Sequence, residues 1–167
     1  MMSNILDKQH QRSGQRIGIF LFFISCFVIL AALFIDYVLG FEACILCIYE
    51  RIPYGFIAIF SLLLFLIPSR LKLLLLLNML CFFIGESIAV YHVGIERNLW
   101  NPSSQCSSQF SISDELSLED FKNHLHNAKL GDCSKPAMHI IGLSLAEINM
   151  ILNFVLIIFL ILEYRKL

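Results

Sequence analysis

The sequence predicts an all-α membrane protein, a single domain over residues 1–167 built as a bundle of four transmembrane helices. The chain has 167 residues, of which 58% are hydrophobic and 15% charged, and its mean hydropathy is +0.77. A soluble domain is nearer half apolar and a quarter charged, and a chain of this length cannot bury so much apolar surface in one aqueous core. The net charge of -1 provides no basic footprint for nucleic acid.

Four apolar runs are each close to the roughly 20 residues that cross about 30 Å of hydrocarbon. We expect the spans at about residues 17–39, 47–67, 71–91 and 143–162. No cleavage site of the A-x-A type follows the first run, so we expect it to remain as an anchor. The second run reaches membrane length only if its helix begins near Cys47, and it ends at Pro68.

Positive charges flank the spans on one side, and this predicts the orientation of the bundle. Lysine and arginine near span ends mark the cytoplasmic side of a membrane. They occur before the first span, between the second and third, and after the fourth: Lys8, Arg12, Arg16, Arg70, Lys72, Arg165 and Lys166. Both termini are therefore expected in the cytoplasm, with outward loops at about residues 40–46 and 92–142.

The chain has six cysteines, and four of them fall in the outward loops: Cys44, Cys47, Cys106 and Cys133. Under the predicted orientation these lie in an oxidising compartment, where disulfides persist. Cys26 and Cys81 lie inside apolar runs, and we expect them to be small, inert hydrophobic residues.

The two loop pairs differ in spacing. Cys44 and Cys47 form a Cys-x-x-Cys pair, whose ring is too small to stabilise much by loop closure but is well suited to thiol–disulfide exchange. Cys106 and Cys133 are separated by 26 residues, so a bridge between them could simply staple the long loop. The two pairs together favour a dithiol relay, although four cysteines allow three pairings.

Zinc is the chemical alternative, because four thiolates could form a tetrahedral site. The wide spacing of the second pair and an oxidising compartment both oppose that interpretation.

The segment FEACILCIYER, residues 41–51, is too short and too apolar to carry its dithiol far from the membrane. A lipid-soluble quinone is the matching acceptor, since a disulfide is also a two-electron couple. Arg51 follows Cys47 by four residues, one helical turn along the same face, and a helix N-terminus near Cys47 would likewise favour a thiolate. The alternative is that Arg51 is an interfacial anchor paired with Glu50.

The long loop also carries a helical pattern. Ser117 to Asp120 resembles a helix start, apolar residues recur at helical spacing from Leu118 to Ala128, and Gly131 is a plausible stop. We expect this helix to lie along the membrane surface or pack on the bundle. Tyr91 and Trp100 are expected as interfacial aromatic residues.

Together these features resemble a known family. Four membrane helices, the sequence CILCIYER before the second of them, a later cysteine pair in the second outward loop and the segment YHVGIE, residues 91–96, are similar to DsbB. The resemblance covers nearly the whole chain. It implies a bacterial inner-membrane disulfide oxidase that reoxidises a periplasmic, thioredoxin-like DsbA and passes the electrons to the membrane quinone pool.

The resemblance also implies roles for the cysteines. The resting protein would hold the disulfides Cys44–Cys47 and Cys106–Cys133. A thiolate of the DsbA-like partner would attack Cys106, the released Cys133 would attack Cys44, and Cys47 would be freed as the thiolate that reduces the quinone.

The quinone site implied by the resemblance contains Cys47 and Arg51, with His92 near the quinone ring. The quinone would be ubiquinone, or alternatively menaquinone. The active loops would face the periplasm.

Three other functions remain open from the sequence. A vitamin K epoxide reductase-like oxidoreductase also uses four helices, two cysteine pairs and a quinone, but there the loop pair precedes the Cys-x-x-Cys in the chain. A membrane protein with structural disulfides and no enzymatic activity is the second alternative, and a carrier that binds metal through its thiols is the third.

Overall fold

The computed structural model describes residues 2–67, 70–102, 106 and 131–166. It contains four long helices, α1 (Met2–Tyr37), α2 (Ile45–Leu66), α3 (Leu71–Glu96) and α5 (Leu145–Arg165). A short antiparallel hairpin, β1 (His139–Ile140) and β2 (Leu143–Ser144), precedes α5. All four helices contain a stretch long and apolar enough to cross a membrane, so the predicted four-helix membrane bundle is confirmed.

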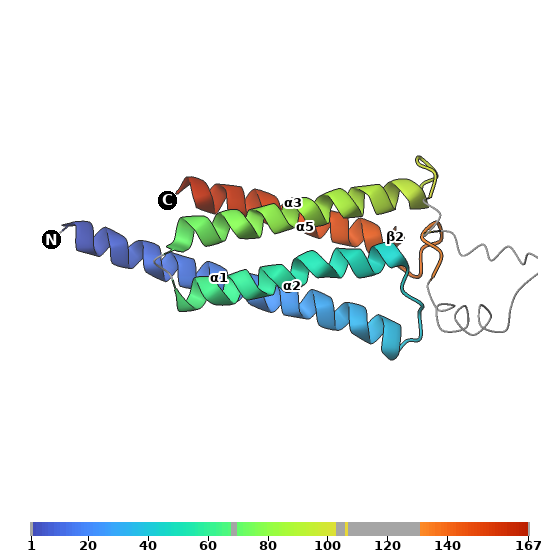
Figure 1. Cartoon of the computed structure of the whole chain (residues 1–167), viewed down its shortest axis with the longest axis horizontal. Coiled ribbons are helices and arrows are strands. Elements are labelled where there is room, and N and C mark those ends of the chain that lie inside the picture. Colours follow the sequence, from blue (N-terminus) through green and yellow to red (C-terminus); the bar gives the residue numbers. More distant parts are fainter. Residues whose placement is uncertain (1, 68–69, 103–105, 107–130, 167) are drawn as a thin grey trace, which may run out of the picture.

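The helices lie lengthwise beside one another (Figure 1). α1 packs against α2, α2 against α3, and α3 against α5. Figure 1 shows both chain ends at one end of the bundle, and the α1–α2 connection and the hairpin at the other. The segment that carries Cys44 and Cys47 therefore lies at the end of the bundle away from the termini.

The helix bounds differ from the predicted spans at both ends of the bundle, and α1 begins at Met2, fifteen residues before the expected span. α2 begins at Ile45, two residues before the expected start, and α3 continues to Glu96, five residues past the expected end. Extending a helix keeps its backbone groups hydrogen-bonded where the chain leaves the membrane. The helix expected from Ser117 toward Gly131 lies largely outside the described residues.

The start of α5 is fixed by a capping box. The Ser144 hydroxyl accepts a hydrogen bond from the Glu147 backbone N–H at 3.1 Å, and the Glu147 carboxylate accepts one from the Ser144 N–H at 2.9 Å. Two backbone donors that the helix cannot satisfy are thereby paired. The Ser-x-x-Glu pattern in the sequence carries this signal.

Buried polar residues join the helices in the middle of the bundle. The Ser61 hydroxyl of α2 donates to Asn78 of α3 at 3.1 Å, and both side chains are fully buried. The Tyr54 hydroxyl lies 2.7 Å from the Asn149 Oδ1 and 2.8 Å from the Asn153 Oδ1, both on α5. Such neutral hydrogen bonds stabilise helix contacts that a purely apolar surface in lipid would leave unspecified.

Gly18 marks the closest approach of α1 to α2. A Cβ atom at this position would lie 2.8 Å from the backbone carbonyl oxygen of Ser61 and 3.1 Å from the backbone nitrogen of Phe65. Small residues at helix contacts let two backbones approach in this way. Gly55, within α2, has nothing within 4 Å of the same hypothetical atom.

These two glycines provide a matched test of the α1–α2 contact. Both changes to alanine remove the entropic penalty of a helical glycine, about 0.5–1 kcal/mol. Gly55→Ala should therefore leave the stability unchanged or raise it, whereas Gly18→Ala should lower it because backbone atoms must move apart, at about 1–3 kcal/mol. Thermal unfolding in detergent micelles measures both. Equal midpoints for the two variants would contradict the close approach at Gly18.

Candidate dithiol redox site

Cys44 is the residue that caps α2. Its backbone is extended, with φ −75° and ψ 165°, and its sulfur accepts a hydrogen bond from the Cys47 backbone N–H at 3.1 Å. The helix begins at Ile45, so the capping position belongs to Cys44, and Cys47 lies within the first turn. Cys47 therefore lies at the positive end of the helix, as expected from the sequence.

A close backbone contact brings the second cysteine pair to the first. The Gly131 N–H donates to the Ala43 carbonyl at 3.1 Å, and Gly131 forms a parallel bridge with Cys44. A Cβ atom at Gly131 would lie 2.5 Å from the carbonyl oxygen of Glu42, so only glycine allows this approach without a shift. Gly131, interpreted from the sequence as a helix stop, is thus the contact point between two segments far apart in the chain.

All four loop cysteines meet in one small cluster. Cys44, Cys106 and Cys133 are each at most 4% exposed, and Cys47 packs against them. The Cys133 N–H donates to the Cys106 carbonyl at 3.3 Å, and the Cys133 side chain packs in one buried cluster with Cys106 and Cys44. Cys133 therefore lies between the two pairs, where it can exchange with either.

The surroundings of Cys133 and Cys44 change the pKa of both thiols. Burial, reinforced by the hydrogen bond to Cys106, raises the pKa of Cys133 to about 11. The pKa of Cys44 is also raised, first by its hydrogen bond with Cys47 and then by burial. Both are therefore protonated at neutral pH when reduced, and a thiolate formed at either position is unfavourable.

His92 of α3 faces the dithiol from the side. Its Nδ1 lies 2.7 Å from Glu50 Oε1, and its Nε2 lies 3.4 Å from the Cys44 sulfur and 3.9 Å from Glu96 Oε1. The second Glu50 oxygen accepts a hydrogen bond from the Asn149 side chain at 2.7 Å. Since an ionised carboxylate only accepts, His92 Nδ1 carries the proton in its pair with Glu50, and Nε2 faces the Cys44 sulfur.

Arg51 pairs with Asp36, at the end of α1. Its guanidinium donates two hydrogen bonds to the carboxylate, at 2.5 Å and 3.0 Å, in the bidentate geometry that suits this pair. The alternative partner considered from the sequence, Glu50, is taken by His92 and Asn149. The Asp36–Arg51 pair fixes α1 against α2 beside the dithiol.

A cavity of about 590 Å³ opens beside these groups and is lined by all four helices. Its polar side holds Cys44, Cys47, Arg51 and His92, and its apolar side is formed mainly by α1 and α5. This volume is within the range of pockets that hold small organic ligands.

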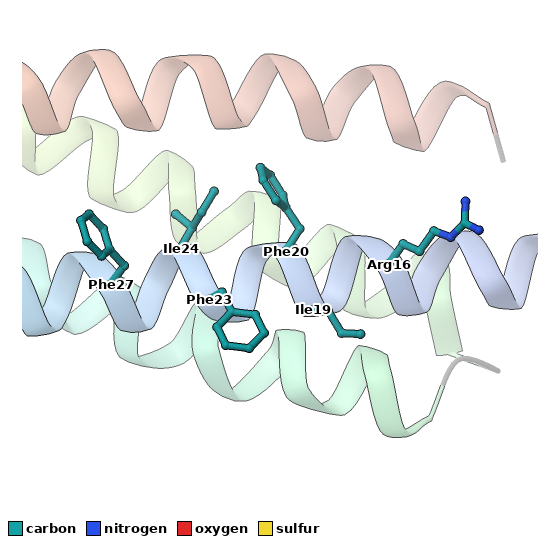
Figure 2. Close-up of a pocket in the computed structure, with 6 residues that line it drawn as sticks. All are labelled: Arg16, Ile19, Phe20, Phe23, Ile24 and Phe27. Carbon is teal, nitrogen blue, oxygen red and sulfur yellow. The ribbon is translucent and has the colours of Figure 1, made fainter.

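A second hollow of about 570 Å³ runs along α1 and shares Phe27 with the cavity. Figure 2 shows Phe20, Ile24 and Phe27 on one side of α1, toward α5, with Ile19 and Phe23 pointing the other way. The Phe20 ring meets Phe159 of α5 edge to face, with centroids 5.5 Å apart. The two hollows share Phe27, and the second continues along apolar residues of α1.

Comparison with known proteins decides the family. The family model "Disulfide bond formation protein DsbB" matches residues 14–162. The chain belongs to the DsbB family. It is 32% identical over 142 residues to disulfide bond formation protein B of Cupriavidus pinatubonensis (80% of this chain and 82% of the relative), and 32% identical over 133 residues to that of Cupriavidus necator (75% and 76%).

A protein of Rickettsia prowazekii, RP370, described as uncharacterized, is 34% identical over 145 residues, covering 86% of this chain and 84% of the relative. Membership of the DsbB family makes this chain a multi-pass membrane protein that takes part in disulfide bond formation as a thiol oxidoreductase.

The structure brings together the site residues predicted from the sequence. The four cysteines and His92 are in one cluster, and Arg51 lies one turn along α2 on the same cavity. The sequence analysis missed three contributors, Asp36, Glu96 and Asn149. For Asp36 a signal existed, because it is the first charge after an uncharged apolar run and polar residues at such positions are costly unless they have a partner.

The raised pKa of Cys133 predicts how this DsbB-family protein reacts with an alkylating agent. In the fully reduced protein, iodoacetamide labelling of Cys133, followed by peptide mass spectrometry, should accelerate about tenfold per pH unit from pH 7 to 10. The thiolate fraction keeps rising until the pH approaches the pKa. A plateau near pH 8.5, the ordinary cysteine value, would contradict the environment described here. The same protein unfolded in detergent is the control and should show that plateau.

Proposed function

We propose that this protein is a quinone-dependent disulfide oxidase of the bacterial inner membrane. It takes two electrons from a DsbA-like, thioredoxin-fold protein of the periplasm and passes them to ubiquinone, or to menaquinone where that is the available quinone. The observation that carries the proposal is the position of Cys133, in contact with Cys106 on one side and with Cys44 on the other, at the edge of a cavity with an apolar side.

The contacts support a relay in which each step exchanges one disulfide for another. A thiolate of the partner attacks the Cys106–Cys133 disulfide at Cys106, which forms a mixed disulfide and releases the Cys133 sulfur. Cys133 attacks Cys44, and the Cys47 thiolate is released. The partner's second thiol then resolves the mixed disulfide, and the partner leaves oxidised.

The remaining steps restore the protein. The freed Cys106 reforms its bond with Cys133, which returns the Cys44 thiol. Cys44 and Cys47 then close their disulfide as two electrons and two protons pass to the quinone, whose chemistry is that of a two-electron acceptor. The net reaction converts a partner dithiol and a quinone into a partner disulfide and a quinol.

Arg51 and His92 have the geometry for the last step. The guanidinium has five N–H donors, and Asp36 holds two of them, so the rest are available toward the cavity and toward an oxygen that gains negative charge. His92 Nε2, 3.4 Å from the Cys44 sulfur, can accept the thiol proton as Cys44 becomes a nucleophile. Glu50 stabilises the resulting imidazolium through Nδ1.

The apolar path along α1 fits the hydrocarbon tail of a membrane quinone. Phe27 lines both the cavity and the second hollow, so a ring placed beside Cys47 could extend its tail past Phe27 along α1. The positive residues at the end of the bundle that holds both termini support an orientation with the cysteine cluster on the periplasmic side.

The first test is turnover by the purified protein with a reduced DsbA-like partner and a short-chain quinone, followed by quinone absorbance. Wild-type protein should reduce the quinone catalytically, and Cys47→Ser should abolish the reaction. Cys106→Ser should stop electron entry from the partner but still allow a small soluble dithiol to reduce Cys44–Cys47 directly. Cys26→Ser is the matched control and should keep full activity. Absence of quinone reduction by the wild-type protein would refute the proposal.

The second test concerns Arg51. Arg51→Gln should raise the quinone KM by about tenfold to a hundredfold, since a hydrogen bond to a charged group contributes about 1.5–3 kcal/mol. Michaelis–Menten kinetics against quinone concentration measure this change. Arg70→Gln, the same change at the opposite end of the bundle, should leave the quinone KM unaltered.

The unpaired Asp36 left by Arg51→Gln could itself disturb the site, and a double variant separates the two effects. Asp36→Asn with Arg51→Gln leaves a neutral pair that can hydrogen-bond without a stranded charge. If Arg51 acts on the quinone, the double variant keeps the raised KM. Recovery of the wild-type KM would show that Arg51 serves only to neutralise Asp36.

A further inference from the structure

We propose that the reduced form of this protein binds one thiophilic divalent cation, such as Zn²⁺, through Cys44, Cys47 and His92. The two sulfurs and a ring nitrogen of His92 all lie within 4.8 Å of one another. This set differs from the four-thiolate site considered from the sequence, because it uses only the first cysteine pair and adds a histidine.

The spacing of the donor atoms fits a tetrahedral ion. With Zn–S bonds of about 2.3 Å and Zn–N bonds of about 2.0–2.1 Å, the sulfur and nitrogen ligands of one zinc lie about 3.6 Å apart. The Cys44 sulfur and His92 Nε2 are 3.4 Å apart. Binding therefore requires small adjustments of side chains already held by the fold.

The histidine is already set for coordination. Its Nδ1–H donates to Glu50 at 2.7 Å, and Glu50 is itself held by Asn149 at 2.7 Å, so Nε2 presents its lone pair toward the two sulfurs. A carboxylate that orients a histidine and increases its basicity is the usual outer partner of a zinc-bound histidine. Glu50 thus acts as a positioning residue for His92.

The surrounding charges favour a cation once the thiols ionise. Two carboxylates flank His92, Glu50 at 2.7 Å and Glu96 at 3.9 Å. The nearby guanidinium of Arg51 is neutralised by Asp36. A divalent ion that replaces the two thiol protons balances the two thiolate charges, and the protons are released to solvent.

The three ligands all line the cavity, so the fourth coordination position opens toward it. Three protein ligands and one open position are typical of zinc sites that exchange a small ligand. A metal ion there would occupy the place where electrons leave Cys47 and would hold the dithiol reduced. The metal-bound protein would be a blocked state, governed by metal availability outside the cytoplasm.

The inference rests on the proposed function only in that turnover would generate the reduced dithiol. Metal binding is measured without turnover, so the metal-site proposal and the oxidase proposal can fail separately. Metal binding without any quinone reduction would support the metal site and refute the oxidase. Quinone reduction without metal binding would support the oxidase and refute the metal site.

The experiment is a titration of the full-length protein in detergent, reduced with a phosphine under nitrogen. Competition with a chromophoric chelator measures Zn²⁺ affinity, and Co²⁺ reports its ligands through thiolate-to-cobalt charge-transfer absorption. We expect one ion per chain in the reduced protein and at least a hundredfold weaker binding after oxidation. No stoichiometric binding to the reduced protein would overturn the proposal.

Variants identify the ligands. Cys44→Ala and His92→Ala should each weaken binding at least tenfold, whereas Cys26→Ala and Cys81→Ala should not change it. Glu50→Gln keeps a hydrogen-bonding side chain and should weaken binding about tenfold to a hundredfold with the cobalt–thiolate absorption retained. Unchanged affinity in both Cys44→Ala and His92→Ala would overturn the assignment.

A further variant separates this site from a four-thiolate site. Cys106→Ser with Cys133→Ser should retain binding and the same cobalt spectrum, because neither residue is among the three ligands. Loss of binding in this double variant would show that the ligand set is wrong.

Discussion

The backbone contact between Gly131 and the segment before α2 is the constraint on which the cysteine cluster depends. It places Cys133 beside Cys44, although 88 positions separate them in the sequence. The contact consists of few hydrogen bonds, and each contributes only about 0.5–1.5 kcal/mol net. In the proposed relay, this contact keeps Cys133 within reach of Cys44.

The acidity of the buried thiols gives the proposed relay a direction. A thiolate released at Cys133 has a pKa raised to about 11, so it is a strong nucleophile and is poorly stabilised by its surroundings. Attack on the adjacent disulfide at Cys44 removes that unfavourable charge. Since the pKa of Cys44 is raised as well, the charge is not favoured there either, and it passes on to Cys47 beside the cavity.

The bundle and the positions of the cysteines could be predicted from the sequence because both depend on local signals. Apolar run length fixes the spans, and spacing fixes the Cys-x-x-Cys pair. α2 begins two residues before the expected start, and its cap is Cys44, although cysteine is not among the residues that usually cap a helix. The close backbone contact of Gly131 was not predicted, because a glycine required for close approach has the same sequence signal as one required for a turn.

The ion pairs of Arg51 with Asp36 and of Glu50 with His92 could not be predicted, because each joins side chains from different helices. Arg51 has a neighbouring acid in the sequence, Glu50, yet its partner is Asp36 on α1, and Glu50 turns to His92 on α3. Helical geometry explains why these two residues pair with different helices. Consecutive residues of α2 project about 100° apart, so Glu50 and Arg51 face different neighbours.

Neutral and charged contacts between the helices lie in different parts of the bundle. In the middle of the bundle the helices are joined by neutral hydrogen bonds, such as Ser61 with Asn78. Among the described residues, the charged pairs that join different helices lie at the cysteine end, where α1, α2 and α3 contribute Asp36, Arg51, Glu50 and His92. Ionisable groups in a membrane protein are costly and persist where they act.

Because Asp36, Arg51, Glu50 and His92 stand on helix ends, their positions are fixed by the packing of the bundle. The bundle therefore holds these charged groups at the cavity, while Gly131 and Asp132 line another part of it. The proposed route of the electrons thus leads from a loop contact to side chains that are fixed on the helices.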